Sequence, residues 1–264
     1  MEFIRKAVER ARSAGPDAPA PDGPAKSVLP PGGTIKQLDP VYLEANRVIA
    51  HDISDARTSA FDMLRTQVLQ AMDQKAWRLL AVTSPTAGCG KTLVAANLAL
   101  SIARLPERPV LLLELDLRKP QLGKTLGLET KSGVIGLLSG SIATRDSIML
   151  MGVGRYRLAA ILAEQPVSNA SEWIASRAMG ALLQLIRREF PSHVVILDTP
   201  PMLAADDFLM LQPQVDCVLL VGAVGTSTMS DIEQCKRHLI SANVVRVVLN
   251  KVRETARPYY GAPV

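Results

Sequence analysis

Ser84-Pro85-Thr86-Ala87-Gly88-Cys89-Gly90-Lys91-Thr92 is the stretch of sequence that decides the fold. An apolar segment, residues 77–83, precedes it, and an apolar helical pattern over 91–104 follows. Glycines in such a loop let backbone N–H groups surround a phosphate, and the start of the helix adds partial positive charge. Lys91 can reach the β- and γ-phosphate oxygens, while Thr92 offers its hydroxyl to Mg²⁺. The pattern predicts a phosphate-binding loop (P-loop) for ATP with Mg²⁺. The expected nucleotide contacts are Thr86, Ala87, Gly88, Cys89, Gly90, Lys91, Thr92 and Leu93.

The loop departs from the usual eight-residue form at Pro85, which replaces the first glycine. An ordinary turn before a helix is the alternative interpretation of its Gly-Lys-Thr ending. The position between a buried strand and an apolar helix favours nucleotide binding, because ligands of open α/β sheets lie beyond the carboxyl ends of the strands.

The rest of the chain repeats the strand–helix alternation. Further strands are expected at 110–115, 157–162, 193–198, 216–221 and 244–250, with helices at 55–72, 171–188 and 230–241. Such alternation requires right-handed crossovers between parallel strands. The predicted fold class is α/β: a P-loop NTPase with a mainly parallel sheet covered by helices on both faces.

Composition places this fold in one domain with disordered ends. The predicted parts are a short amphipathic helix at 1–12, a flexible Pro/Gly-rich linker at 13–54, a P-loop kinase or ATPase domain at 55–252, and a tail at 253–264. The apolar positions of the first part are Phe3, Ile4, Ala7, Val8 and Ala11. A helix this short is marginal in isolation, so a frayed segment is the alternative.

Charge and targeting patterns narrow the class of protein. The net charge is +5, but the 30 basic residues are dispersed among 25 acidic ones, so no nucleic-acid partner is expected. The three cysteines have no metal-type spacing. Because neither a secretory signal nor an apolar stretch of membrane-spanning length is evident, we expect a cytoplasmic location.

Carboxylates and an amide are expected at the ends of three strands. Alternation points Glu114 and Asp116 to the same side at the end of one strand, and Asp198 ends another. Close to a P-loop, such acids suggest Mg²⁺ ligands and base chemistry, although a solvated pair neutralised by neighbouring cations is the alternative. Asn250, at the last strand end, is expected to hydrogen-bond adenine unless it only ends the strand.

These motifs together resemble the bacterial tyrosine kinase (BY-kinase) family, in particular its stand-alone, exosortase-associated cytoplasmic branch. The resemblance spans residues 55–251 and rests on Walker A (85–92), an acid-x-acid-x-Arg motif (114–118), Walker B (194–198) and the segment 169–176. It implies an ATP-dependent tyrosine autokinase that regulates exopolysaccharide or capsule polymerisation and export.

The resemblance also implies roles for individual residues. Lys91, Glu114, Asp116 and Arg118 would be catalytic, with Glu114 in the position of an Asp that accepts the tyrosine proton. Thr92, Asp116 and Asp198 would bind Mg²⁺, and Tyr259 and Tyr260 would accept the phosphoryl group. A membrane chain-length determinant (polysaccharide co-polymerase) would activate the chain and recruit it to the inner face of the membrane.

Departures from the family pattern leave other functions open. Glu114 is longer than the Asp of the family, and the tail holds only two tyrosines. The family's Glu-x-x-Arg-x-x-Arg assembly motif is replaced by Ser59, Asp62 and Arg65, so a homo-oligomer is possible but does not follow from the motif. One alternative is a partitioning-type P-loop ATPase, which would carry a second lysine where Thr86 stands. The other is a degenerate ATP-binding regulator of a co-polymerase.

Overall fold

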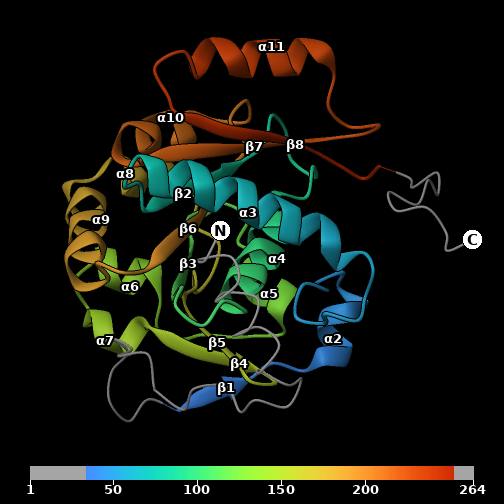
Figure 1. Cartoon of the computed structure of the whole chain (residues 1–264). Coiled ribbons are helices and arrows are strands. Elements are labelled where there is room, and N and C mark those ends of the chain that lie inside the picture. Colours follow the sequence, from blue (N-terminus) through green and yellow to red (C-terminus); the bar gives the residue numbers. More distant parts are fainter. Residues whose placement is uncertain (1–33, 253–264) are drawn as a thin grey trace, which may run out of the picture.

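An eight-stranded sheet forms the centre of the fold in the computed structural model, which describes residues 34–252 (Figure 1). The predicted helix at 1–12, the linker as far as residue 33, and the tail with Tyr259 and Tyr260 lie outside the described residues. The strand order is β1-β4-β5-β3-β6-β2-β7-β8. The strands are β1 (Ile35–Gln37), β2 (Leu79–Thr83), β3 (Val110–Glu114), β4 (Met149–Val153), β5 (Tyr156–Ile161), β6 (Val194–Asp198), β7 (Cys217–Ala223) and β8 (Val244–Asn250).

All neighbouring strands pair in parallel except β4 and β5, which form an antiparallel hairpin. The prediction of a mainly parallel sheet is therefore confirmed. The hairpin reverses direction at Gly154, whose φ of 56° is left-handed and favours glycine. Beyond the hairpin, β1 pairs with β4 at the edge of the sheet.

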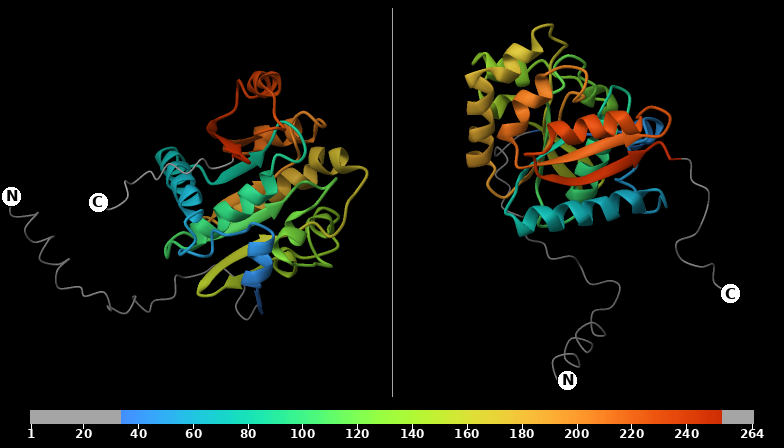
Figure 2. Two further views of the ribbon diagram at one scale, coloured as in Figure 1. Left: turned by 90° about the vertical axis from the view of Figure 1, so that its right-hand side faces the viewer. Right: turned by 90° about the horizontal axis from the view of Figure 1, so that it is seen from above.

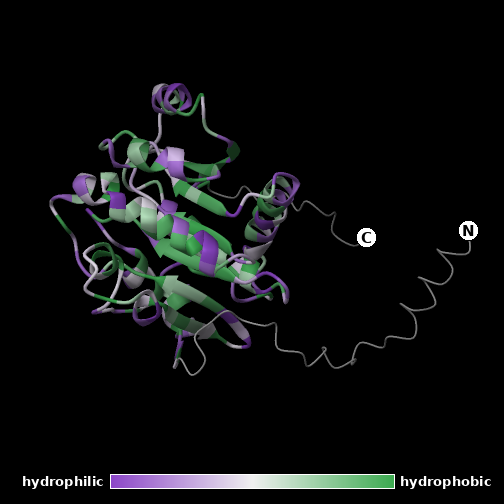
Figure 3. Ribbon diagram, turned by 90° about the vertical axis from the view of Figure 1, so that its left-hand side faces the viewer, coloured by the Kyte–Doolittle hydropathy of each residue, from purple (hydrophilic) through white to green (hydrophobic). Residues whose placement is uncertain are grey.

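Helices cover both faces of the sheet, as predicted. One face packs against α2 (Pro40–Ala45), α3 (Thr58–Gln74), α4 (Lys91–Ala103) and α5 (Leu122–Leu126). The other packs against α6 (Val134–Leu138), α8 (Ala170–Ala175), α9 (Arg177–Glu189), α10 (Asp207–Leu211) and α11 (Met229–His238). Figure 2 shows these layers from two further sides, and Figure 3 shows apolar strands between helices with polar outer faces. Burial on both sides explains why β2, β3 and β6 read as continuous apolar runs.

The helix predicted at 171–188 is two helices. Ser176 separates α8 from α9, and its hydroxyl accepts a hydrogen bond from the Met179 backbone N–H (3.2 Å), which caps the start of α9. Two further short elements, α7 (Thr144–Ser147) and the 3₁₀ turn η1 (Gln212–Gln214), were not predicted, and neither were β1, β4, α2, α5, α6 and α10. Segments this short carry too little periodicity to distinguish them from loops.

The domain begins before residue 55, so the predicted linker is wrong over residues 34–54. Leu43, Val48 and Ala50 are completely buried. The side-chain oxygen of Asn97 in α4 also accepts hydrogen bonds from the backbone N–H groups of Ile49 (2.8 Å) and Ala50 (3.0 Å). The low apolar content of the preceding Pro/Gly-rich segment hid this packing, because it is created by contacts with α4 about 50 residues away in sequence.

Candidate functional site

Three neighbouring strands, β3, β6 and β2, bring the sequence motifs together at their carboxyl ends. Asp198 pairs in register with Glu114 on one side and with Val82 on the other. The P-loop follows β2, the acid-rich segment follows β3, and Asp198 is the last residue of β6. Residues more than 100 positions apart in sequence therefore meet at the carboxyl ends of the central strands.

The P-loop has the left-handed backbone that its glycines permit. Gly88 and Gly90 have φ values of 81° and 89°, and Gly90 caps the start of α4. A Cβ atom at Gly90 would lie 2.3 Å from the side-chain nitrogen of Asn250, so this position also requires glycine for close approach. The Pro85 carbonyl accepts a hydrogen bond from the Leu203 N–H (3.0 Å), so the loop is attached to the segment after β6 at the position where it departs from the usual motif.

Lys91 links the other two motifs. Its ammonium group donates to Asp116 (2.7 Å) and lies 3.5 Å from an oxygen of Asp198. Burial alone would lower the pKa of Lys91, but the charges of Asp198 and Asp116 outweigh burial and raise that pKa above its ordinary value. Burial raises the pKa of Asp198, and Lys91 counters this effect. The site therefore holds a permanent buried cation at the start of α4.

The donor set fits Mg²⁺ bound together with a nucleotide. Asp198 is completely buried, and its Oδ2 atom has no hydrogen-bond partner in the part of the chain that the structure describes. An unsatisfied carboxylate oxygen is costly unless it gains a cation or a water. Residues 34–252 contain no cluster of three or more His, Cys, Asp or Glu side chains suited to a metal. Mg²⁺ at phosphate sites needs no such cluster, because phosphates and waters complete its octahedron.

Arg118 is held by a second ion pair. Its guanidinium donates to both oxygens of Asp207 (2.6 and 3.2 Å) and to the Ser171 hydroxyl (2.6 Å), which in turn donates to Asp207. Burial would raise the pKa of Asp207, but the hydrogen bonds from Arg118 and Ser171 prevail and lower it. Asp207 lies nine positions after Asp198, beyond the motif, and no local pattern marks it; only Ser171 belongs to a segment singled out in the sequence.

A cavity of about 490 Å³ opens at this convergence. Of the predicted site residues, those lining it are Ala87, Gly88, Gly90, Lys91, Thr92, Leu93, Asp116 and Arg118. The lining residues that were not predicted are Lys119, Gln121, Thr125, Pro200, Pro201, Ala204, Ala205 and Asp207. Among these residues, the Pro200-Pro201 pair could have been expected near the site from the sequence, because it follows the strand that ends at Asp198. The cavity is thus lined by P-loop residues together with charged, polar and apolar residues from the segments after β3 and β6.

Glu114 does not share this cavity. Its carboxylate is 1% exposed and accepts hydrogen bonds from the backbone N–H groups of Leu122 (2.6 Å) and Ala163 (3.0 Å). Burial is the main cause that raises the pKa of Glu114 to about 7. The expectation that Glu114 and Asp116 act side by side does not match this arrangement, because the strand ends at Glu114 and alternation does not continue into the loop.

Asn250 and the P-loop residues Cys89 and Thr86 do not line the cavity. Asn250 donates to the Cys89 carbonyl (2.9 Å) and accepts from the Lys251 N–H (2.8 Å), so its amide holds the loop in this structure. The Cys89 thiol is buried, 3.4 Å from the Ser227 hydroxyl. The Thr86 carbonyl accepts a hydrogen bond from the Ser84 hydroxyl (2.8 Å).

Fold and site together define a P-loop nucleotide-binding domain. The family described as CobQ/CobB/MinD/ParA nucleotide binding domain (CbiA) matches residues 80–258. The chain belongs to this family. No helix within residues 34–252 has the length and apolar character needed to cross a bilayer.

Several of the similar proteins are named as tyrosine kinases. The chain is 35% identical over 225 residues to a putative tyrosine-protein kinase EpsB of Ralstonia solanacearum, covering 84% of this chain and 29% of the relative. It is 29% identical over 229 residues to a putative tyrosine-protein kinase AmsA of Erwinia amylovora, covering 86% and 31%. The kinase domain of Escherichia coli tyrosine kinase ETK superposes with a TM-score of 0.70 at 27% identity, over 82% of this chain and 84% of that one. These comparisons confirm the resemblance to bacterial tyrosine kinases. The chain spans less than a third of the length of the curated relatives.

Proposed function

We propose that this chain is an ATP-dependent tyrosine autokinase that regulates exopolysaccharide or capsule polymerisation and export. The observation that carries the proposal is the buried Lys91, placed between Asp116 and Asp198 at the P-loop of a chain similar to named tyrosine kinases. This arrangement gives a γ-phosphate a cation and gives Mg²⁺ two carboxylates and a threonine hydroxyl.

ATP and Mg²⁺ are the proposed cofactors. Thr92, Asp116 and Asp198 would hold the metal ion, which supplies charge neutralisation on the β- and γ-phosphates. Lys91 would exchange its contact with Asp116 for phosphate oxygens. In the transfer, the bond between the γ-phosphorus and the β–γ bridging oxygen breaks and ADP leaves, while a bond from phosphorus to the tyrosine oxygen forms and the tyrosine proton passes to water.

Glu114 supports this chemistry best as a positioning residue. Its two hydrogen bonds hold the backbone of Leu122, next to the cavity residue Gln121, and of Ala163. The loose transition state of phosphoryl transfer makes modest demands on a base, so catalysis can proceed by positioning and charge. Arg118, on the cavity wall, is the proposed second cation for the phosphoryl group or for a partner copy.

Tyr259 and Tyr260 are the proposed phosphoacceptors, in a neighbouring copy of the chain. The proposed activator is a membrane chain-length determinant of the polysaccharide co-polymerase type, which would recruit the chain to the cytoplasmic side of the membrane. The support is the naming of similar proteins as tyrosine kinases. No nucleic-acid partner is proposed.

A regulator that binds ATP without transferring phosphate is the second candidate. The specific observation in its favour is the burial of Glu114 away from the cavity, since a base in the expected position is then missing. A partitioning-type ATPase has less support, because Thr86 stands where that class carries its second lysine.

Intact-mass analysis of the full chain with ATP·Mg²⁺ tests the proposal. We expect added phosphate on Tyr259 or Tyr260 that is lost in Lys91→Met and in the double variant Tyr259→Phe/Tyr260→Phe. The double variant should still bind ATP with unchanged affinity, whereas Lys91→Met should lose at least tenfold in affinity. ATP binding without phosphotyrosine, even with the cytoplasmic segment of a candidate activator, would favour the regulator.

A further inference from the structure

Helix α9 carries more apolar surface than the core uses. Its core face consists of Met179, Leu182, Leu183 and Ile186, which are at most 6% exposed. A second stripe, Ala178, Ala181 and Leu185, faces outward at helical spacing, and none of its members is fully buried. The helix therefore presents an apolar seam on the outside of the fold.

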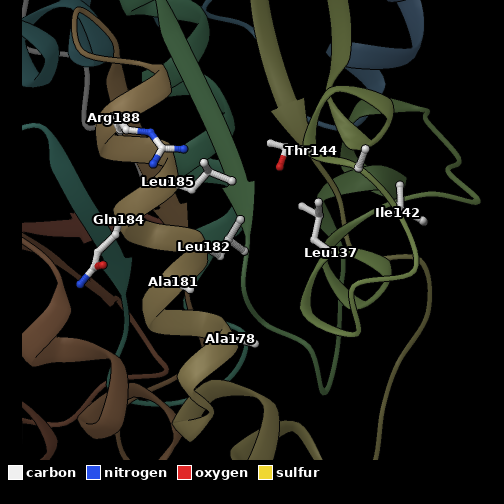
Figure 4. A pocket seen from close by; sticks show the side chains of 10 residues that line it. Leu137, Ile142, Thr144, Ala178, Ala181, Leu182, Gln184, Leu185 and Arg188 are labelled. Carbon is white, nitrogen blue, oxygen red and sulfur yellow. The ribbon is translucent and has the colours of Figure 1, made fainter.

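This seam forms one wall of a groove. The opposite wall comes from α6, the turn after it and the start of α7, through Leu137, Ile142 and Thr144. In Figure 4 these side chains face Ala178, Leu182 and Leu185 of α9 across the opening. The groove encloses about 690 Å³ here and continues into a further space of about 370 Å³ beside Ile148 and Phe190. Ala143, Thr144 and Leu185 line both spaces, so the two are adjacent. Its shape, a cleft along a helix with small residues on the wall, suits an amphipathic helix.

The described part of the chain begins close to Ile148, which lines the smaller of the two spaces. Ile35, the first residue of β1, pairs with Leu150, two positions after the groove residue Ile148. One strand spacing and two residues of strand rise place Ile35 within about 10 Å of Ile148. In Figure 1, β1 begins at its left-hand end, on the side of the picture where α7 lies.

We propose that residues 3–11 dock as a helix in this groove, through the face formed by Phe3, Ile4, Ala7, Val8 and Ala11. A chain of 23 residues, the number between Ala11 and Ile35, can extend over as much as about 75 Å, whereas α9 is about 20 Å long. These residues are therefore numerous enough to let residues 3–11 reach every point of the groove, and the linkage makes the docking intramolecular. A segment too short to form a stable helix alone gains one by burying its apolar face.

Photo-crosslinking of the full chain tests this docking. In Phe3→p-benzoylphenylalanine, illumination should join position 3 to residues 137–148 or 178–190 of the same chain. The same substitution at Glu9, on the opposite face of the predicted helix, should give at least fivefold less of this product. Ala181→Glu places a charge in the groove and should also reduce the product at least fivefold.

The matched control is Ala175→Glu, which makes the same change at an exposed alanine outside the groove and should leave the yield unchanged. Thermal melts of both glutamate variants show whether the fold is intact. Covalent dimers would assign the groove to a second copy. Products elsewhere, no product, or a yield insensitive to Ala181→Glu in a folded chain would equally overturn the proposal.

Discussion

Two acids two positions apart lie in different environments. Asp116 forms an ion pair with Lys91 in the cavity. Glu114 does not line the cavity, and its two carboxylate oxygens accept hydrogen bonds from backbone N–H groups. Because the pKa of Glu114 is raised from 4.5 to about 7, the folded state binds this proton more tightly than the unfolded state. The contribution of Glu114 to the free energy of unfolding is therefore largest below pH 4.5 and is lost as the pH rises through 7.

Glu114→Gln should remove this pH dependence. Between pH 5 and pH 8 the free energy of unfolding of the unmodified chain should fall by on the order of 2–3 kcal/mol more than that of the variant. Urea denaturation at both pH values, with EDTA present, measures the difference. Equal slopes with pH in the two proteins would contradict the raised pKa.

Helices α3 and α4 are joined by a half-buried charged cluster. Asp62 accepts hydrogen bonds from Arg65 (3.0 Å), Ser101 (2.6 Å) and Arg104 (2.9 and 3.0 Å). Arg65 also donates to the Ser101 carbonyl (3.0 Å). Two of the three positions that align with the assembly motif, Asp62 and Arg65, thus make contacts inside this subunit, and their side chains are 29% and 15% exposed.

Asp62→Ala should lower the free energy of unfolding by about 2 kcal/mol, because it leaves two largely buried guanidinium groups without their carboxylate. Asp73→Ala is the matched control. Asp73 makes a similar bidentate pair with Arg108, but those side chains are 49% and 40% exposed. We expect less than about 1 kcal/mol there. Equal losses in urea denaturation of the two variants would show that burial does not decide the strength of these pairs.

At the scale of the whole molecule, the segment before α3 is part of the folded unit. Removing residues 1–33 should lower the melting temperature by only a few degrees, since it removes no more than the proposed docking of residues 3–11. Removing residues 1–54 should lower it by about 10 °C or more, since several kcal/mol of burial and two hydrogen bonds to Asn97 are lost. Scanning calorimetry of both truncations provides the measurement. Similar melting temperatures would restore the boundary at residue 55.

The parts of the fold that were predicted are those with strong local patterns. The strands formed by apolar runs, the helix that starts at Lys91 and the P-loop can each be recognised from a pattern within about ten residues. The short edge strand β1 and its neighbour β4 were missed, since three to five residues hold too little periodicity. In the site, Lys91 and Thr92 followed from the P-loop motif, and Asp116 and Asp198 followed from strand ends. Asp207 was recognised only through its contact with Arg118.

By itself, the sequence determined the chemistry: a phosphate-binding loop, a lysine and strand-ending acids, because a P-loop is built from consecutive residues whose backbone conformation depends on their own glycines. Only the tertiary structure decided which acids share the cavity, which carboxylate pairs with Arg118, and where the domain begins. These outcomes depend on burial and on contacts between residues tens of positions apart, and such contacts form only when the sheet brings the strand ends together.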